Sequence, residues 1–379
     1  MYLYQKSNLY FAQVADDIKD IAEGEMRSLG AVETRPTYRG ISFRADLKTL
    51  YRINYYSRLS SRILAPLIQF DCHSERYLYK TALQIKWEDF LDPSRTFAVF
   101  SSLANSSIKH SKYAALCLKD AIVDYFKEHF GERPSIDTNQ PDIWFNLHVE
   151  NNEATISLDT SGGSLHRRGY RKDAVSAPMV ETLAAAIIQY SGWDGIKPIY
   201  DPFCGAGTLL CEAFLHASNT PSGILRKRFG FERMPDFDNR IWSQVKTEAR
   251  EKIRPVAKGL ISGSDISQEA IKYSHNNFSA IDHDSVISVK KKDVFDIDAI
   301  NNRVIICNPP YGIRSGRDED MGGFYKKFGD FLKHRCNGST AYVYFGEREN
   351  IKYLGLKPSW KKPISNGGLD GRLARYELY

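Results

Sequence analysis

Apolar positions in the first 160 residues follow helical and strand spacing in turn. From Val14 to Leu29 they recur on one helix face, and Gly30 is placed as a stop. Two predicted strands, 143–150 and 154–159, meet at Asn151-Asn152, which predicts a hairpin. Further helices are predicted at 47–63, near 74–85 and at 110–130, and strands at 40–44, 96–103, 143–150 and 154–159. The pattern indicates an α+β region with small sheets and helices on one side, built of two successive units, about 1–65 and 66–160.

The clearest predicted linker is Ser161-Gly162-Gly163-Ser164, and beyond it strands and helices alternate. This alternation is typical of a doubly wound parallel sheet, so the fold class is α/β with a preceding α+β module. The segment 219–258 interrupts the alternation with basic and aromatic residues; it is either an ordered lid, which would contact substrate, or helical padding, and the first is favoured. Strands are predicted at 198–200, 260–262, 286–289, 304–307 and 341–345, and helices at 178–190, 208–217, 268–278 and 324–332.

Composition places the chain among ordinary globular proteins. Its 379 residues allow two or three domains with real cores. The N-terminus lacks the features of a signal peptide, and no stretch approaches about 20 uninterrupted apolar residues, so neither secretion nor a membrane span is expected. The six cysteines show no CxxC pair, which favours reduced thiols in a cytoplasm over disulfides or a metal site.

Charge is unevenly distributed. Residues 1–165 contain 19 Lys and Arg against 21 Asp and Glu, whereas residues 166–379 contain 33 against 25. Within the acidic half, residues 27–62 carry eight basic side chains and two acidic ones. This arrangement suits a polyanion such as nucleic acid, with a solvated surface of mixed charge as the alternative. The candidate contacts are Arg39, Arg44, Arg52, Arg58, Arg62, Arg226, Lys227 and Arg228.

The strand predicted at 304–307 ends in Asn308-Pro309-Pro310-Tyr311. Adjacent prolines donate no backbone hydrogen bond, so we expect their carbonyls to point outward as unpaired acceptors. An amide oxygen and an aromatic face beside them suit an exocyclic amino group on a planar ring. The alternative is a plain proline turn after a core strand.

A glycine-containing turn, 201–208, follows the first strand of the second half and opens a helix. Glycines such as Gly205 and Gly207 let the backbone approach a ligand closely. Asp201, Asp265 and Asp293 follow three successive strands, so their side chains should share the carboxyl edge where open α/β sheets bind ligands. Asp265 is placed to accept from ribose hydroxyls and Asp293 from an adenine amino group. Each of these aspartates could alternatively be a cap or turn residue.

Other chemistries find little support. A Walker-type Gly-Lys-Ser/Thr and a Ser-His-Asp elbow are both absent from the sequence. For Cys204, Cys211 and Cys307 apolar packing is the better interpretation. Cys72-His73 has no further ligand spacing, so no metal is predicted.

The motifs DPFCGAGT, GSDIS, KDVF and NPPYG, in this order, resemble those of class I S-adenosylmethionine-dependent amino-methyltransferases. The lead-in Leu165-His166-Arg167-Arg168-Gly169-Tyr170-Arg171 and the C-terminal Asn366-Gly367-Gly368-Leu369 are similar to those of THUMP-domain RNA guanine-N2 methyltransferases, particularly the bacterial large-subunit ribosomal RNA branch. The resemblance implies a ferredoxin-like unit at 1–65, a THUMP RNA-binding domain at 66–160, a linker at 161–177 and a Rossmann-like catalytic domain at 178–379. Some members carry a second fused methyltransferase. Because the motifs of only one occur in this sequence, a single activity is expected.

The implied cofactor is S-adenosylmethionine, held by Asp201, Phe203, Gly205, Gly207, Thr208, Asp265, Ile266, Asp293, Val294 and Asn308. The expected catalytic residues are Asn308, Pro309, Pro310 and Tyr311: the Asn308 amide oxygen and the Pro309 carbonyl accept from the amine, and Tyr311 stacks on the base. The tetrapeptide identifies an sp² amino nitrogen rather than its owner. Transfer-RNA guanine, DNA adenine and protein glutamine therefore stay open beside ribosomal RNA, as does a non-catalytic RNA-binding factor.

Overall fold

The structure is a computed structural model that describes residues 1–173, 178–310, 320–366 and 369–379. The chain divides into two compact units. The first comprises Met1–Leu165 with Arg226–Thr247, and the second comprises His166–Leu225 with Glu248–Tyr379. The middle of the predicted insert, 226–247, therefore packs with the N-terminal half of the chain. Among the residues described, no helix is both long enough and apolar enough to cross a bilayer.

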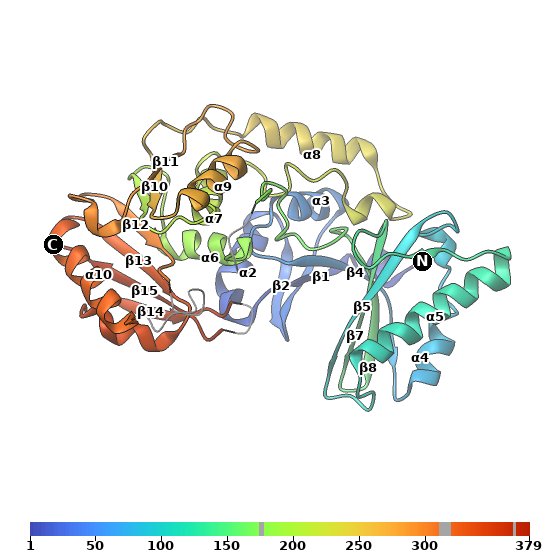
Figure 1. The fold of residues 1–379 in the computed structure, drawn as a ribbon. Coiled ribbons are helices and arrows are strands. Elements are labelled where there is room, and N and C mark those ends of the chain that lie inside the picture. Colours follow the sequence, from blue (N-terminus) through green and yellow to red (C-terminus); the bar gives the residue numbers. More distant parts are fainter. Residues whose placement is uncertain (174–177, 311–319, 367–368) are drawn as a thin grey trace. The chain divides into compact units, whose positions relative to one another are not determined.

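The first unit contains one continuous sheet of eight strands in the order β2-β3-β1-β4-β8-β7-β5-β6 (Figure 1). The expectation of small separate sheets is corrected by the ten-residue strand β4, which pairs with β1 near its start and with β8 along most of its length. β4 also crosses the boundary placed between residues 65 and 66. The strands are β1 Leu9–Gln13, β2 Val32–Thr37, β3 Gly40–Arg44, β4 Arg62–Asp71, β5 Thr96–Ala104, β6 Ser135–Ile136, β7 Ile143–Glu150 and β8 Glu153–Asp159.

The helices of this unit end where local chemistry stops them. α5 ends at Gly131, whose φ of +73° is left-handed, and the β7–β8 turn uses Asn151 and Asn152 at φ +52° and +63°, as the predicted hairpin requires. The helices are α1 Leu3–Ser7, α2 Lys19–Ser28, α3 Leu47–Tyr56, α4 Glu75–Ala82 and α5 Ser111–Phe130, with the 3₁₀ turns η1 Asp16–Ile18, η2 Trp87–Asp89 and η3 Gly230–Arg233. α8, Asn239–Glu251, runs across the unit boundary at Thr247.

The helix predicted at 47–63 was too long. α3 ends at Tyr56 because the buried carboxylate of Glu25 on α2 organises the next residues into a loop. It accepts from the Ser57 hydroxyl at 2.8 Å, the Arg58 amide at 2.9 Å and the Leu59 amide at 3.3 Å. Donors that would otherwise continue the helix are satisfied by a side chain distant in sequence.

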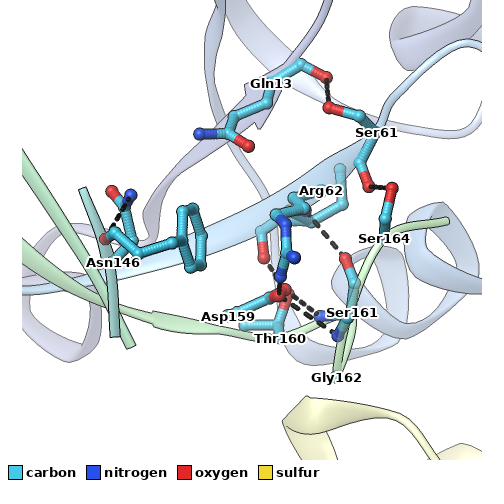
Figure 2. Close-up of polar contacts among 12 residues, drawn as sticks. Gln13, Ser61, Arg62, Asn146, Asp159, Thr160, Ser161, Gly162 and Ser164 are labelled. Atoms are coloured by element: carbon cyan, nitrogen blue, oxygen red, sulfur yellow. Dashed lines mark hydrogen bonds and ion pairs between the residues drawn. The ribbon is translucent and has the colours of Figure 1, made fainter. Parts of the chain in front are cut away.

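The Ser161-Gly162-Gly163-Ser164 segment is an ordered structural element rather than a loose linker. Figure 2 shows its polar contacts: the Ser161 hydroxyl accepts from the Ile63 amide at 2.8 Å, and Asp159 accepts from the Ser161 amide at 2.9 Å and pairs with Arg62. Arg226 donates to the carbonyls of Ser161, Gly163 and Ser164 at 3.0–3.1 Å. One guanidinium thus supplies donors to three backbone carbonyls of this segment.

The second unit is built on a seven-stranded sheet in the order β11-β10-β9-β12-β13-β15-β14 (Figure 1). Neighbours from β11 to β13 run parallel, and β15 is antiparallel to both β13 and β14. The predicted doubly wound class is confirmed; the terminal hairpin β14–β15 was not predicted. The strands are β9 Ile199–Asp201, β10 Ile261–Asp265, β11 Ser288–Lys291, β12 Val304–Cys307, β13 Thr340–Phe345, β14 Trp360–Pro363 and β15 Arg372–Glu377.

The strand order reverses direction beside β9, because β10 and β11 extend the sheet to one side and β12 and β13 to the other. Such a switch point opens a crevice at the carboxyl ends of the strands. The helices of the unit are α6 Glu181–Ser191, α7 Thr208–Ala217, α9 Gln268–Phe278 and α10 Met321–Arg335, with the 3₁₀ turns η4 Val294–Asp296 and η5 Arg348–Leu354.

Candidate active site

A cavity of about 510 Å³ lies in the second unit, at the carboxyl ends of β9, β10 and β12 and beside η4. Its volume is in the range of small-molecule sites, roughly 300–1,000 Å³. Nine of the ten residues expected to hold the cofactor line it: Asp201, Phe203, Gly205, Thr208, Asp265, Ile266, Asp293, Val294 and Asn308. Gly207 is the tenth and is not among the lining residues. Residues that the sequence did not single out also line it: Pro178, Met179, Pro202, Cys204, Ala206, Leu209, Ser267, Ala270, Phe295 and Phe324.

The glycine turn between β9 and α7 has two different glycines. Gly205 has φ +53° and open space where a side chain would stand, so its backbone faces the cavity. At Gly207, φ is +82° and a Cβ would lie 2.4 Å from the ring of Phe278. Gly207 is thus required for the close packing of α7 against α9, and it shapes the site without lining it.

Asp201, at the end of β9, is 1% exposed and its carboxylate accepts from the Phe203 amide at 3.0 Å. Burial raises the pKa of this carboxyl well above its ordinary value, and the neighbouring Asp265 raises it further. Cys204, Cys211 and Cys307 are also buried, and burial raises the pKa of each thiol, which agrees with a packing role.

The other two strand-end aspartates organise the backbone around the cavity. Asp265 accepts from the Gly205 amide at 2.9 Å with one oxygen and from the Ser267 amide at 2.9 Å with the other. Asp293 caps η4 by accepting from the Phe295 amide at 3.0 Å. The alternative role as turn and cap residues is therefore real. Because each carboxylate oxygen has two lone pairs, these contacts leave acceptor capacity for a ligand.

The end of β12 brings an unsatisfied acceptor to the same cavity. The Asn308 Oδ1 atom is buried and has no hydrogen-bond partner among the described residues. Pro309 is buried, and Pro310 is exposed and lines the cavity. The expectation that both proline carbonyls are unpaired is corrected for Pro310, whose carbonyl accepts from the Tyr325 hydroxyl at 3.0 Å. Tyr311 lies outside the described residues.

Two arginines of the segment 165–171 bind residues at the start of α6 and on α7, two helices next to the cavity. Arg171 pairs with Glu181 at 2.9 Å and donates to the Met179 carbonyl at 2.8 Å and the Thr208 hydroxyl at 3.1 Å. Arg168 reaches the buried carboxylate of Glu212 at 3.3 Å. The lead-in thus ties the start of α6 to α7, the helix that the glycine turn opens.

The Asn277 side chain makes a second connection to this turn. Its amide donates to the Ala206 carbonyl at 2.9 Å, and its carbonyl oxygen accepts from the Lys172 amide at 2.8 Å. Both supports depend on partners distant in sequence, and no motif spacing pointed to them.

The basic residues proposed to contact nucleic acid lie in different surroundings. Arg62 pairs with the fully buried Asp159, and its guanidinium lies over Phe100 at 4.2 Å and Trp144 at 4.8 Å. Arg226 is bound to the 161–164 segment, and Arg58 is 8% exposed. We leave these three out of the proposed RNA surface.

The remaining candidates are more accessible. Arg39 and Lys227 are exposed, and Arg228 is exposed but pairs with Asp142 at 3.2 Å. Arg44 pairs with Glu33 at 2.8 Å, and Arg52 is half-buried and donates to the Leu29 carbonyl at 3.4 Å. Arg39 and Lys227 are therefore the strongest of the original set.

The family description "RMKL-like, methyltransferase domain" matches residues 168–375, "THUMP domain" matches 72–159 and "RlmL ferredoxin-like domain" matches 10–64. The chain belongs to the family defined by the RMKL-like methyltransferase domain. The predicted family, its enzyme class of methyltransferase and its fold are thereby confirmed.

Proteins of similar sequence match almost the whole length of this chain. A Synechocystis sp. protein named as a candidate RNA methyltransferase is 39% identical over 98% of this chain and 97% of its own length. The ribosomal RNA large subunit methyltransferase K/L of Syntrophotalea carbinolica is 35% identical over 97% of this chain and 53% of its own length. The chain thus spans about half the length of the K/L relatives. The crystal structure of SMU.472, a candidate methyltransferase complexed with SAH, is 26% identical, with a TM-score of 0.84 and 98% coverage of both chains.

Proposed function

We propose that the protein transfers a methyl group from S-adenosylmethionine to the exocyclic N2 amino group of a guanosine in large-subunit ribosomal RNA. The observation that carries the proposal is the buried Asn308 Oδ1, an acceptor without a partner, in the same cavity as the glycine turn and the strand-end aspartates. The similar crystal structure of SMU.472 holds the demethylated cofactor, SAH, and K/L relatives are named for the large-subunit RNA.

The residues of the cavity fit this cofactor. Gly205 leaves open space along the backbone, and Asp265 and Asp293 retain acceptor capacity for hydroxyl and amino donors of an adenosine. The buried Asp201, whose carboxyl pKa is raised by burial, lines the same cavity and is expected beside the methionine part. When bound, S-adenosylmethionine supplies an electrophilic methyl group on a sulfonium.

The chain's own contribution is alignment of the acceptor. The Asn308 Oδ1 atom and the Pro309 carbonyl accept the two hydrogens of the guanine amino group, which turns the nitrogen lone pair towards the donor. As the amine gains positive charge, these two oxygens stabilise it without having to reorganise. The target base must leave its stack to reach a recessed site, which favours an unpaired or flipped guanosine. A strong general base is unnecessary, because the proton can leave after transfer.

Incubation of the purified protein with radiolabelled S-adenosylmethionine and separate pools of ribosomal RNA, transfer RNA and duplex DNA tests the proposal. We expect label in ribosomal RNA, recovered as N2-methylguanosine by nucleoside mass spectrometry, and its loss from RNA of a deletion strain. Label confined to transfer RNA or to DNA adenine would contradict the proposed substrate. Absence of label from all three, with RNA binding intact, would instead favour a non-catalytic RNA-binding factor.

A further inference from the structure

Tyr325 of α10 is a buried residue that contacts residues 308–310 at the end of β12, the proposed catalytic tip. Its side chain is 0% exposed, and its hydroxyl donates to the Pro310 carbonyl at 3.0 Å. Its ring packs against Phe324 and Phe345, each with centroids 5.5 Å apart. The packed ring therefore holds the hydroxyl at a fixed place in the core of the second unit.

The backbone of the tip makes this contact effective. Proline rings fix φ at Pro309 and Pro310, and a residue that precedes proline is confined to extended conformations, which restricts Asn308 and Pro309 as well. The rings leave the ψ torsion of Pro310 free, and this torsion sets the direction of the Pro310 carbonyl. A hydrogen bond to that carbonyl therefore fixes the last rotatable part of the tip 308–310.

α10 also joins the tip to the cavity. Phe324, next to Tyr325, lines the cavity together with Asn308 and Pro310, and its ring packs 5.8 Å from that of Phe295 and 5.9 Å from that of Phe203. The start of α10 thus contacts both the cofactor side of the cavity and the tip. Any shift of the tip relative to α10 would move the Asn308 Oδ1 atom away from its position in the cavity.

We propose that Tyr325 is a positioning residue for methyl transfer: through the Pro310 carbonyl it holds the amine-accepting atoms of Asn308 and Pro309 in register with the cofactor site. This inference rests on the proposed function. Tyr325 touches no substrate and acts only through the tip, so its effect belongs in the rate of the chemical step rather than in binding.

The test compares Tyr325→Phe with Tyr344→Phe. Tyr344 is an equally buried tyrosine of the same unit, whose hydroxyl donates to the Ile364 carbonyl at 3.0 Å, outside the cavity lining. Both variants lose one buried hydroxyl, so comparable losses of stability are expected. For Tyr325→Phe we expect kcat to fall on the order of 10- to 100-fold, with KM for RNA and Kd for S-adenosylhomocysteine within about twofold of wild type. Tyr344→Phe should keep the wild-type kcat. Equal kcat values in the two variants would overturn the inference.

A second measurement needs no RNA and separates this inference from the proposed function. Sinefungin carries an amine where the cofactor carries its methylsulfonium, so its affinity relative to S-adenosylhomocysteine reports whether the acceptors of the tip face that position. If the wild-type protein methylates no RNA, this ratio decides. A ratio that changes in Tyr325→Phe but not in Tyr344→Phe supports the positioning role, and a ratio identical in wild type and Tyr325→Phe overturns it.

Discussion

At the scale of single residues, two buried polar groups show how context sets a role. Asn308 Oδ1 has no partner, although leaving a buried acceptor unsatisfied costs about 1–3 kcal/mol. Glu25 is the opposite case, a buried carboxylate that accepts from three donors of one loop. We propose that a ligand of the cavity satisfies the first, whereas the chain's own loop satisfies the second.

Asn308→Ala should lower kcat by about 100-fold or more, because it removes an acceptor aimed at charge that develops in the transition state. Affinity for S-adenosylhomocysteine should change by only a few-fold, as measured by titration calorimetry. The matched control is Asn276→Ala, which removes an amide bonded to Asp173 at 2.7 Å outside the cavity lining. A methylation rate in Asn308→Ala equal to that of the control would remove Asn308 from the mechanism.

Glu25 predicts a pH dependence. Burial raises the pKa of its carboxyl, so the folded protein binds this proton more tightly than the unfolded chain does. The contribution of Glu25 to stability is therefore greatest below the ordinary glutamate pKa, and it declines as pH rises through the folded-state value. Relative to Glu25→Gln, wild type should lose unfolding free energy as pH rises above the ordinary glutamate pKa of 4.5 in urea titrations. A difference that stays constant or grows with pH would contradict this.

At the scale of elements, the segment 161–164 shows how composition can mislead. Its Gly and Ser content is typical of a flexible linker, yet Asp159 and Arg226 bind its backbone. Arg226 is more than sixty residues away in the chain, and nothing in the local sequence indicates that it returns to this turn. The side chain of Arg226 therefore holds the segment 161–164 in one conformation within the first unit.

Arg226→Ala should therefore destabilise the protein by about 2 kcal/mol, because several carbonyls lose their donor at once. Arg226→Lys should restore little, since a single ammonium cannot reproduce the spread of a guanidinium. Lys227→Ala, at the exposed neighbouring position, should stay within about 0.5 kcal/mol of wild type. Chemical denaturation followed by circular dichroism measures all three. Equal stabilities of the Arg226 and Lys227 alanine variants would show that Arg226 does not stabilise the segment 161–164.

Elements that depend on local pattern were predictable, and those that depend on distant partners were not. The motif-bearing turns after β9 and β10, the helix α5 and the β7–β8 hairpin follow from spacing, glycine and asparagine positions. The early end of α3 depends on Glu25, and the pairing of β4 with both β1 and β8 depends on strands far along the chain. The aspartates and Asn308 were predicted for the cavity from their strand-end positions, whereas the contacts of Tyr325 with Pro310 and of Arg171 with Met179 could not be read from the motifs that contain or flank these residues.

At the scale of the whole molecule, charge and chain path matter most. The formal net charge is +6, and the surplus lies in residues 166–379. Of the arginines first proposed for RNA contact, several serve internal contacts, which leaves Arg39 and Lys227 as exposed candidates on the first unit. The RNA surface is thus predicted to be sparser than the sequence stripe suggested.

RNA affinity should fall as salt rises, through release of counterions from the phosphates. Arg39→Ala and Lys227→Ala should each weaken binding and reduce the slope of log affinity against log salt by about 1 if the side chain contacts a phosphate. Lys112→Ala, an exposed cation on α5, is the control. Fluorescence anisotropy at several salt concentrations gives the slopes. Slopes equal to that of the control would exclude both residues from the RNA surface.

The return of residues 226–247 to the first unit limits how this protein can be dissected. Phe231 and Trp242 pack on Tyr51 and Tyr55 of α3, with ring centroids 4.3–6.3 Å apart. A catalytic fragment cut at residue 166 would keep these rings without their partners, and an N-terminal fragment ending there would expose the matching half of the same aromatic cluster. Both truncation products should aggregate, so separate expression of the halves requires grafting 226–247 onto the first and bridging the gap in the second.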